Sequence, residues 1–161
     1  MREEIVGLLP RLRRFARAIT RHAADADDLV QITVERALTH LDQRRADTRL
    51  ESWMFGIMKN AWVDEMRARG RRSRVLAPEE FGENVAEPAS ASHHELLVIE
   101  DALGRLPEDQ RMAIALVLIE GLSYREASDV LEVPIGTLTS RLARGRAALT
   151  AILEVEPGVA P

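Results

Sequence analysis

The sequence predicts an all-α protein built from two small helical domains joined by a flexible linker. Apolar residues recur at intervals of three and four along most of the chain, which is the helical period. No stretch alternates β-branched and polar residues, so strands are not expected. Residues 78–95 are rich in Pro, Ala, Ser and Glu and lack periodic apolar residues, a composition typical of a linker.

The composition excludes several classes of protein. The 161 residues are 46% hydrophobic and 30% charged, as in soluble globular proteins, and they include no cysteine. The chain shows neither a signal peptide nor an apolar run near the roughly 20 residues that span a bilayer. It also lacks a phosphate-binding glycine loop and any His–carboxylate constellation. We therefore expect a cytoplasmic protein that is not an enzyme, with no membrane span, cofactor, metal or small-molecule substrate.

The net charge of −4 hides an uneven distribution. Residues 1–76 hold 16 basic and 11 acidic side chains, whereas residues 77–105 hold one basic and seven acidic ones. The remaining residues, 106–161, hold five basic and eight acidic side chains. Because local fields decide binding, the acidic total does not argue against a polyanionic partner.

The first part of the chain, residues 1–76, is expected to form three helices. The first carries apolar residues at helical spacing, namely Leu8, Leu12, Phe15, Ala16 and Ile19. The second has an acidic start at 24–28, which suits the helix dipole. Its apolar residues are Leu29, Ile32, Ala37, Leu38 and Leu41. The third runs from about Ser52, a candidate N-cap, to Arg69.

The third predicted helix is apolar on two sides. One stripe, expected in the core, comprises Trp53, Met54, Ile57, Met58 and Ala61, and the other comprises Phe55, Lys59, Trp62 and Met66. Such a helix is either buried on both sides or turns its second stripe toward unpaired bases. We expect Trp53 and Ile57 in the core. We expect DNA contacts from the aromatic, basic and amide side chains Lys59, Asn60, Trp62, Arg67, Arg71 and Arg72.

The last part of the chain contains a helix-turn-helix pattern. A stripe of Leu96, Ile99, Leu103 and Leu106 precedes a helix opened by Pro107. Ser123 and Glu126 then form a capping box, Glu132 and Val133 form a turn, and Pro134 opens the next helix. In that helix the residues expected to face inward are Ile135, Leu138, Leu142 and Leu149. Those left on the free face are Thr137, Thr139, Ser140, Arg141, Arg144 and Arg146.

This free face suits DNA. Arginine pairs with guanine or phosphate, and small hydroxyl side chains reach phosphates or base edges. Three arginines alone would indicate a solvated face, but a short helix, a tight turn and a basic helix together favour DNA recognition.

Three segments of the chain resemble a known protein family. The segment SYREASDVLEVPIGTLTSRLARGRAAL resembles the −35-reading helix-turn-helix of bacterial RNA polymerase sigma factors, specifically the extracytoplasmic-function (ECF) group of the sigma-70 family. DADDLVQITVERAL resembles the helix that docks on core RNA polymerase, and WMFGIMKNAWVDEMRARGRR resembles the segment that melts and reads the −10 element. The resemblance covers about residues 5–76 and 96–153. It implies region 2 at residues 1–76, an acidic linker at 77–95 and region 4 at 96–161.

The resemblance also implies partners and sites. Core polymerase, through a coiled coil of its largest subunit, would be bound by Asp27, Asp28, Gln31 and Glu35, which share a helix face. Promoter DNA and an anti-sigma factor are the other expected partners. The implied function is promoter-specific transcription initiation in a stress response, with the protein associated with the nucleoid when active. The linker would thread the polymerase channels.

Two departures from the family pattern weaken the DNA-binding half. Glu132 occupies a turn position that the family often fills with glycine, and a left-handed turn costs another residue about 1 kcal/mol. Thr139 stands where a lysine is common, which removes a phosphate contact. Two alternatives stay open: a helix-turn-helix regulator that binds operators by itself, and a sigma mimic that titrates an anti-sigma factor.

Overall fold

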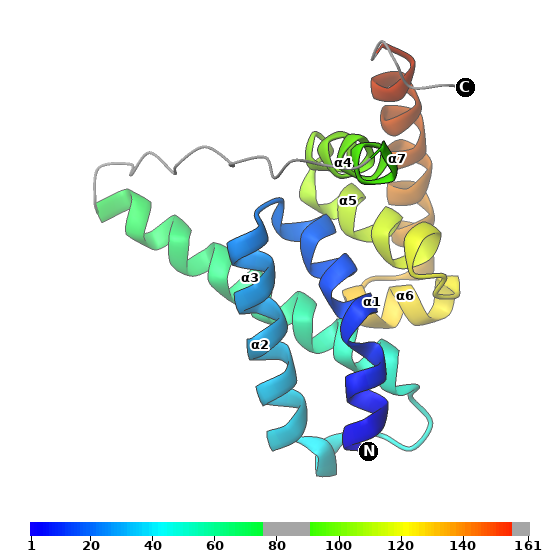
Figure 1. Cartoon of the computed structure of the whole chain (residues 1–161). Coiled ribbons are helices and arrows are strands. Elements are labelled where there is room, and N and C mark those ends of the chain that lie inside the picture. The colour runs from blue at the N-terminus through cyan, green and yellow to red at the C-terminus, as the bar shows by residue number, and fades with distance from the viewer. Residues whose placement is uncertain (76–90, 156–161) are drawn as a thin grey trace.

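The structure, a computed structural model, describes residues 1–75 and 91–155, which are mostly helical (Figure 1). The front half, residues 1–75, contains α1 (Arg2–Thr20), α2 (Ala23–Thr39), the short 3-10 turn η1 (Leu41–Gln43) and α3 (Leu50–Val75). The rear half, residues 91–155, contains α4 (Ala91–Gly104), α5 (Glu108–Ile114), the π-helical turn η2 (Ala115–Ile119), α6 (Tyr124–Leu131) and α7 (Ile135–Val155). No strand occurs in these two ranges, and the predicted all-α class is confirmed.

In the front half α1, α2 and α3 pack against one another. Their apolar stripes meet in a core where Phe15 and Phe55 are fully buried, with ring centroids 5.1 Å apart in an edge-to-face arrangement. The predicted start of α3 is wrong by about half a turn. Trp53 N donates to Arg49 O at 3.0 Å, so the helix begins before Ser52, which is therefore not its N-cap.

The rear half packs α7 against α4, α5 and α6. Leu103 and Leu106 of the predicted stripe are buried, whereas Ile99 is exposed. Helix α4 begins at Ala91, so the last residues of the predicted linker, 91–95, are helical. Residues 77–90 of that linker lie outside the described residues.

The two halves lie directly against each other. Helix α1 contacts α4, α5 and η2, and α3 contacts α6 (Figure 1). Buried apolar side chains from both halves form one cluster that runs from Ile5 to Leu142. The two predicted domains are therefore packed together, and surfaces that each would expose alone are shared. Among the described residues, no helix is both long and apolar enough to cross a bilayer.

Candidate nucleic-acid interface

The turn between α6 and α7 has the predicted helix-turn-helix construction. Ser123 Oγ accepts from Glu126 N at 3.1 Å, and Glu126 Oε1 accepts from Ser123 N at 3.2 Å, which confirms the capping box. Helix α6 ends at Glu132 in the left-handed conformation, with φ 57° and ψ 44°. The chain then enters α7, where Leu138 N donates to Pro134 O at 3.1 Å. The end of α6, the turn and the start of α7 therefore follow the predicted helix-turn-helix pattern.

Helix α7 presents most of its predicted DNA-contacting residues to solvent. Thr139, Ser140, Arg144 and Arg146 are exposed, and Thr137 is half-buried. Arg141 is also half-buried, and its Nε lies 3.6 Å from Asp109 Oδ2 of α5. The outer face of α7 therefore offers two exposed arginines flanked by hydroxyl groups, as a helix that enters the major groove would.

The opposite face of α7 seats the helix on α5. Leu138 and Leu142 are buried as predicted, and a methyl group added at Gly145 would lie 2.9 Å from Ile114 Cγ1. Only a glycine lets the helices approach this closely. The prediction that Ile135 faces inward is wrong, since this residue is exposed. It lies in the first turn of α7, at the end of the packed region.

The predicted polymerase-binding residues share the outer face of α2. All four are exposed: Asp27, Asp28, Gln31 and Glu35. Two apolar residues of the same helix, Ile32 and Leu38, are also exposed, whereas Leu29 and Ala37 are buried. Positions 28, 32 and 35 follow the helical period, so acidic and apolar side chains form one face. Such a face can bind a partner that is both basic and apolar.

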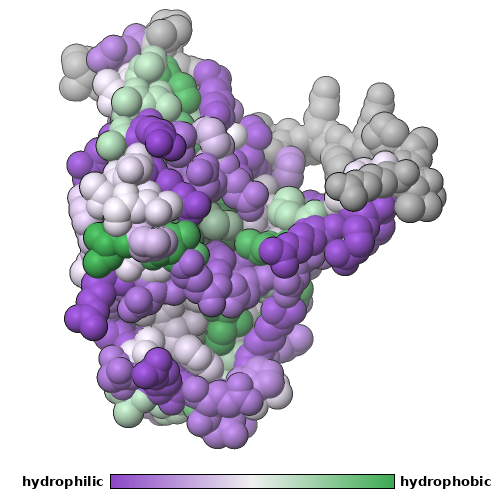
Figure 2. Space-filling view, turned by 180° about the vertical axis from the view of Figure 1, so that it is seen from behind, coloured by the Kyte–Doolittle hydropathy of each residue, from purple (hydrophilic) through white to green (hydrophobic). Residues whose placement is uncertain are grey.

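The second half of α3 forms a basic arm. Figure 1 shows it projecting from the body, and in Figure 2 the arm is strongly hydrophilic. Asn60, Arg67, Arg71 and Arg72 are exposed along this helix, and Arg72 Nη2 lies 3.1 Å from Glu65 Oε1. These cations suit the backbone of nucleic acid.

Two residues expected to face DNA are covered instead. Trp62 is 5% exposed, and the Arg69 guanidinium lies over its ring at 5.3 Å. Lys59 is 7% exposed, with its Nζ 3.0 Å from Glu132 Oε2 in the helix-turn-helix. Both side chains are therefore covered in this packed arrangement, and their contact with DNA stays a prediction. The reason is tertiary: the front bundle encloses one side of α3 and α6 the other.

The core stripe of α3 is also placed differently in detail. Met54 and Met58 are fully buried, but Trp53 and Ile57 are only half-buried and pack at the margin of the core. Of the two interpretations of this helix, burial on both sides matches its first half.

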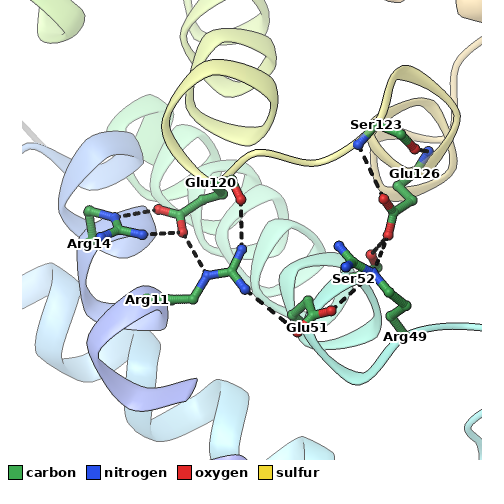
Figure 3. A network of polar contacts seen from close by, with 8 residues as sticks. All are labelled: Arg11, Arg14, Arg49, Glu51, Ser52, Glu120, Ser123 and Glu126. Atoms are coloured by element: carbon green, nitrogen blue, oxygen red, sulfur yellow. Dashed lines mark hydrogen bonds and ion pairs between the residues drawn. The ribbon is translucent and has the colours of Figure 1, made fainter. Parts of the chain in front are cut away.

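A polar network between the halves was not predicted (Figure 3). Its centre is Glu120, whose side chain is 0% exposed. Arg14 donates to both carboxylate oxygens at 2.8 Å. Arg11 donates from Nε to Oε1 at 3.2 Å and from Nη2 to the backbone oxygen at 2.7 Å. The hydrogen bond to Glu120 raises the pKa of Arg14. Charge-assisted contacts of this kind offset the cost of burying the carboxylate.

The π-helical turn η2 places Glu120 in this network. Glu120 N donates to Ala115 O at 2.9 Å, and Leu122 N donates to Leu116 O at 3.0 Å. Gly121 follows in a left-handed conformation, with φ 74°. Wide turns of this type are uncommon and often mark functional positions. Sequence periodicity gives no signal for such a turn, which explains why the role of Glu120 was missed.

Glu126 joins the halves at a second point. Besides capping α6, its Oε2 accepts from Arg49 Nε at 2.6 Å and from Ser52 Oγ at 2.8 Å (Figure 3). Partial burial acts to raise the pKa of Glu126, but hydrogen bonds from Ser123, Ser52 and Arg49 outweigh it. The pKa is therefore lowered from its ordinary value.

Comparison with known proteins decides the family. Residues 5–59 match the family model "Sigma2 domain of PhyR", and residues 96–149 match "Sigma-70, region 4". The ECF RNA polymerase sigma factor EcfG of Rhodopseudomonas palustris (strain TIE-1) is 36% identical over 157 residues, which cover 97% of this chain and 86% of that protein. The chain belongs to the ECF sigma factors.

Solved structures agree with this assignment. The sigma factor RpoE of Bartonella quintana, in complex with the anti-sigma factor NepR, matches with a TM-score of 0.87 and 33% identity over 96% of this chain and 97% of that one. CnrH, in complex with the cytosolic domain of CnrY, matches with a TM-score of 0.71 and 28% identity over 97% and 91% of the two chains. The packed arrangement described above therefore also occurs in these two structures.

Proposed function

We propose that this ECF sigma factor binds core RNA polymerase and directs it to promoters. In this proposal residues 1–76 act as region 2, residues 77–95 as a linker and residues 96–161 as region 4. The observation that carries the proposal is the presence of two separate exposed faces on one chain. The outer face of α7 bears Arg144 and Arg146, and the outer face of α2 bears acidic and apolar side chains.

The two faces suit different partners. The α7 face and the basic arm of α3 carry cations for DNA, while Asp28, Gln31 and Glu35 on α2 would meet a basic surface of the polymerase. Each exposed DNA surface is small, and a few phosphate contacts give weak, salt-sensitive binding. Polymerase would supply the missing affinity by holding both surfaces against one promoter. The role is therefore one of binding and positioning, performed where the polymerase acts, in the cytoplasm.

An anti-sigma factor is the third proposed partner. The RpoE relative was solved with the anti-sigma factor NepR, and CnrH with the cytosolic domain of CnrY. Because this chain shares their packed arrangement, a protein of that kind would find a comparable surface here. Dissociation from the anti-sigma factor would free the chain to bind polymerase, as expected for a sigma factor that acts in a stress response.

In vitro transcription with core polymerase and genomic fragments tests the proposal. Arg144→Ala should reduce promoter-specific transcripts while leaving co-purification with core polymerase intact. Asp28→Arg should abolish co-purification with core polymerase and, as a consequence, the promoter-specific transcripts as well. Thr150→Ala, at an exposed position near the end of α7, serves as the matched control. A chain that never associates with core polymerase would refute the assignment.

The same assay separates the two alternatives. A stand-alone regulator would shift duplex operator DNA without polymerase and would tolerate Asp28→Arg. A sigma mimic would bind an anti-sigma factor yet yield no promoter-specific transcript. The exposed arginines of α7 favour the promoter-directing role over the mimic.

A further inference from the structure

Cationic and hydroxyl side chains line the side of α3 that faces α6. Arg49, just before α3, and Ser52 hold the carboxylate of Glu126, and Lys59 holds the carboxylate of Glu132. We propose that this row is a phosphate-binding site for a DNA strand, and that Glu126 and Glu132 occupy the phosphate positions while the halves are packed. The inference rests on the proposed function only in taking promoter DNA as the ligand.

The contacts have the chemistry of phosphate recognition. At Glu126 a guanidinium and a hydroxyl converge on one anionic oxygen, at 2.6 and 2.8 Å. Arginine and serine are typical ligands of DNA phosphate oxygens, and lysine binds them as a point charge. A carboxylate presents the same kind of anionic oxygen, so either group satisfies these donors.

The spacing along α3 also fits a strand. Ser52 and Lys59 lie seven residues apart, nearly two full turns, and therefore share one side of the helix. The axial separation is roughly 10 Å at 1.5 Å per residue. This separation suits two phosphates of one strand that lie one or two nucleotides apart, so a single strand can contact both positions.

The rear-half carboxylates are held weakly enough to be exchanged. Each ion pair has one partner open to water: the Glu132 side chain is 72% exposed beside Lys59 at 9%, and the Arg49 side chain is 55% exposed beside Glu126 at 28%. An ion pair that is open to water on one side contributes less to stability than a fully buried one. Glu132 also adopts a left-handed conformation that disfavours a non-glycine residue. A polyanion that reaches this side of α3 can therefore replace them once the halves separate.

The sequence supplies a direct probe of the covered site. Lys59 is the only lysine in the chain, so an amine-acetylating reagent reports on this one side chain and the N-terminus. The decisive variant is Glu126→Gln with Glu132→Gln, in which glutamine keeps the capping-box geometry. The charge-matched control is Glu108→Gln with Glu154→Gln, two exposed residues of the rear half.

Two measurements use the full chain without polymerase. Acetylation of Lys59, relative to the N-terminal amine, should be several-fold faster in the Glu126→Gln/Glu132→Gln variant than in the control. A fluorescent single-stranded oligonucleotide of mixed sequence should bind this variant roughly three- to thirtyfold more tightly than it binds the control. The slope of the logarithm of the oligonucleotide binding constant against the logarithm of salt concentration should steepen by about 0.7 for each additional phosphate that the row neutralises. The oligonucleotide should also protect Lys59 from acetylation.

A further change keeps the test specific. Adding Lys59→Gln to the Glu126→Gln/Glu132→Gln variant should remove much of the increase in affinity, because that increase requires the uncovered lysine. Equal DNA affinity in the decisive and control variants would overturn the proposal, as would failure of DNA to protect Lys59. Transcription with core polymerase is scored separately. If transcription is intact but the Glu126→Gln/Glu132→Gln variant binds the oligonucleotide no more tightly than the control, only the covered phosphate site is refuted. If the affinity for the oligonucleotide increases but the chain does not bind polymerase, only the proposed function is refuted.

Discussion

The outer face of α7 and the inner side of α3 carry similar chemistry, yet they stand in opposite states. Both combine arginine or lysine with small hydroxyl groups, and the sequence predicts DNA contacts for residues of both helices. Arg144 and Arg146 on α7 are exposed, whereas Lys59 on α3 is buried against Glu132. The difference teaches that residue type decides what a surface can bind, while the position of the other half decides when it can bind.

The contacts that cover α3 differ in strength. Glu120 is fully buried and bound by two arginines of α1, whereas Glu126 and Glu132 pair with α3 and the residue before it at the edge of the interface. A buried carboxylate that loses its partners is costly, while an exposed pair contributes little. Glu120 thus anchors the arrangement, and the edge pairs decide whether the side of α3 is available.

Removal of the anchor should have the largest effect. Glu120→Ala deletes the carboxylate that accepts hydrogen bonds from Arg11 and Arg14, and it leaves a gap beside α1. We expect the free energy of unfolding to fall by about 3 kcal/mol, measured by urea denaturation. Glu154→Ala, at an exposed position, should change it by less than about 0.5 kcal/mol. A similarly small change in the free energy of unfolding for both variants would contradict the role of Glu120 as the anchor between the halves.

The next largest effect is expected where α7 packs closely against α5. In Gly145→Val the new side chain would clash with Ile114, whose Cγ1 lies 2.9 Å from the position of an added Cβ. We expect a loss of about 2 kcal/mol of stability from overpacking, together with weaker duplex binding in gel shifts with polymerase. Gly136→Ala is the control, since nothing lies within 4 Å of its added Cβ. Equal tolerance of both changes would show that α7 does not depend on this close approach.

A smaller effect concerns the exposed face itself. Arg146→Ala removes an exposed cation from α7 and should leave the fold unchanged. Promoter binding by the polymerase complex, measured by anisotropy across a salt series, should lose about 0.9 from its slope if the arginine contacts one phosphate. An unchanged slope would show that Arg146 does not contact a DNA phosphate, and the same measurement would then be made on Arg144→Ala.

The smallest effect is a pH dependence of the edge contact. Since the pKa of Glu126 is lowered in the folded chain, its contribution is present above the ordinary carboxyl pKa and is lost as pH falls through the folded value. Between about pH 6 and about pH 3 the stability difference between the wild type and Glu126→Gln should shrink by about 0.5 kcal/mol. Urea denaturation at each pH measures it. A difference that grows toward acid would have the wrong sign.

Local signals in the sequence were sufficient to predict most of the helices, but not the π-helical turn η2, the start of α3 or the start of α4. The 3.6-residue period predicts the helices, Ser123 and Glu126 predict the start of α6, and Pro134 with its neighbours predicts the turn into α7. These features depend on residues a few positions apart, which the sequence displays directly. The outward placement of Asp28 and Glu35 on α2, and of Arg144 on α7, follows from the same periodicity.

The contacts between the halves were decided only by the tertiary structure. Arg11 and Glu120 are 109 positions apart, and Lys59 and Glu132 are 73 apart, so no periodicity links them. The burial of Trp62 and Lys59 and the exposure of Ile135 likewise depend on which helix lies beside them. Sequence determined the chemistry of each helix, because that chemistry is local. Packing determined which surfaces remain open, because burial is set by distant neighbours.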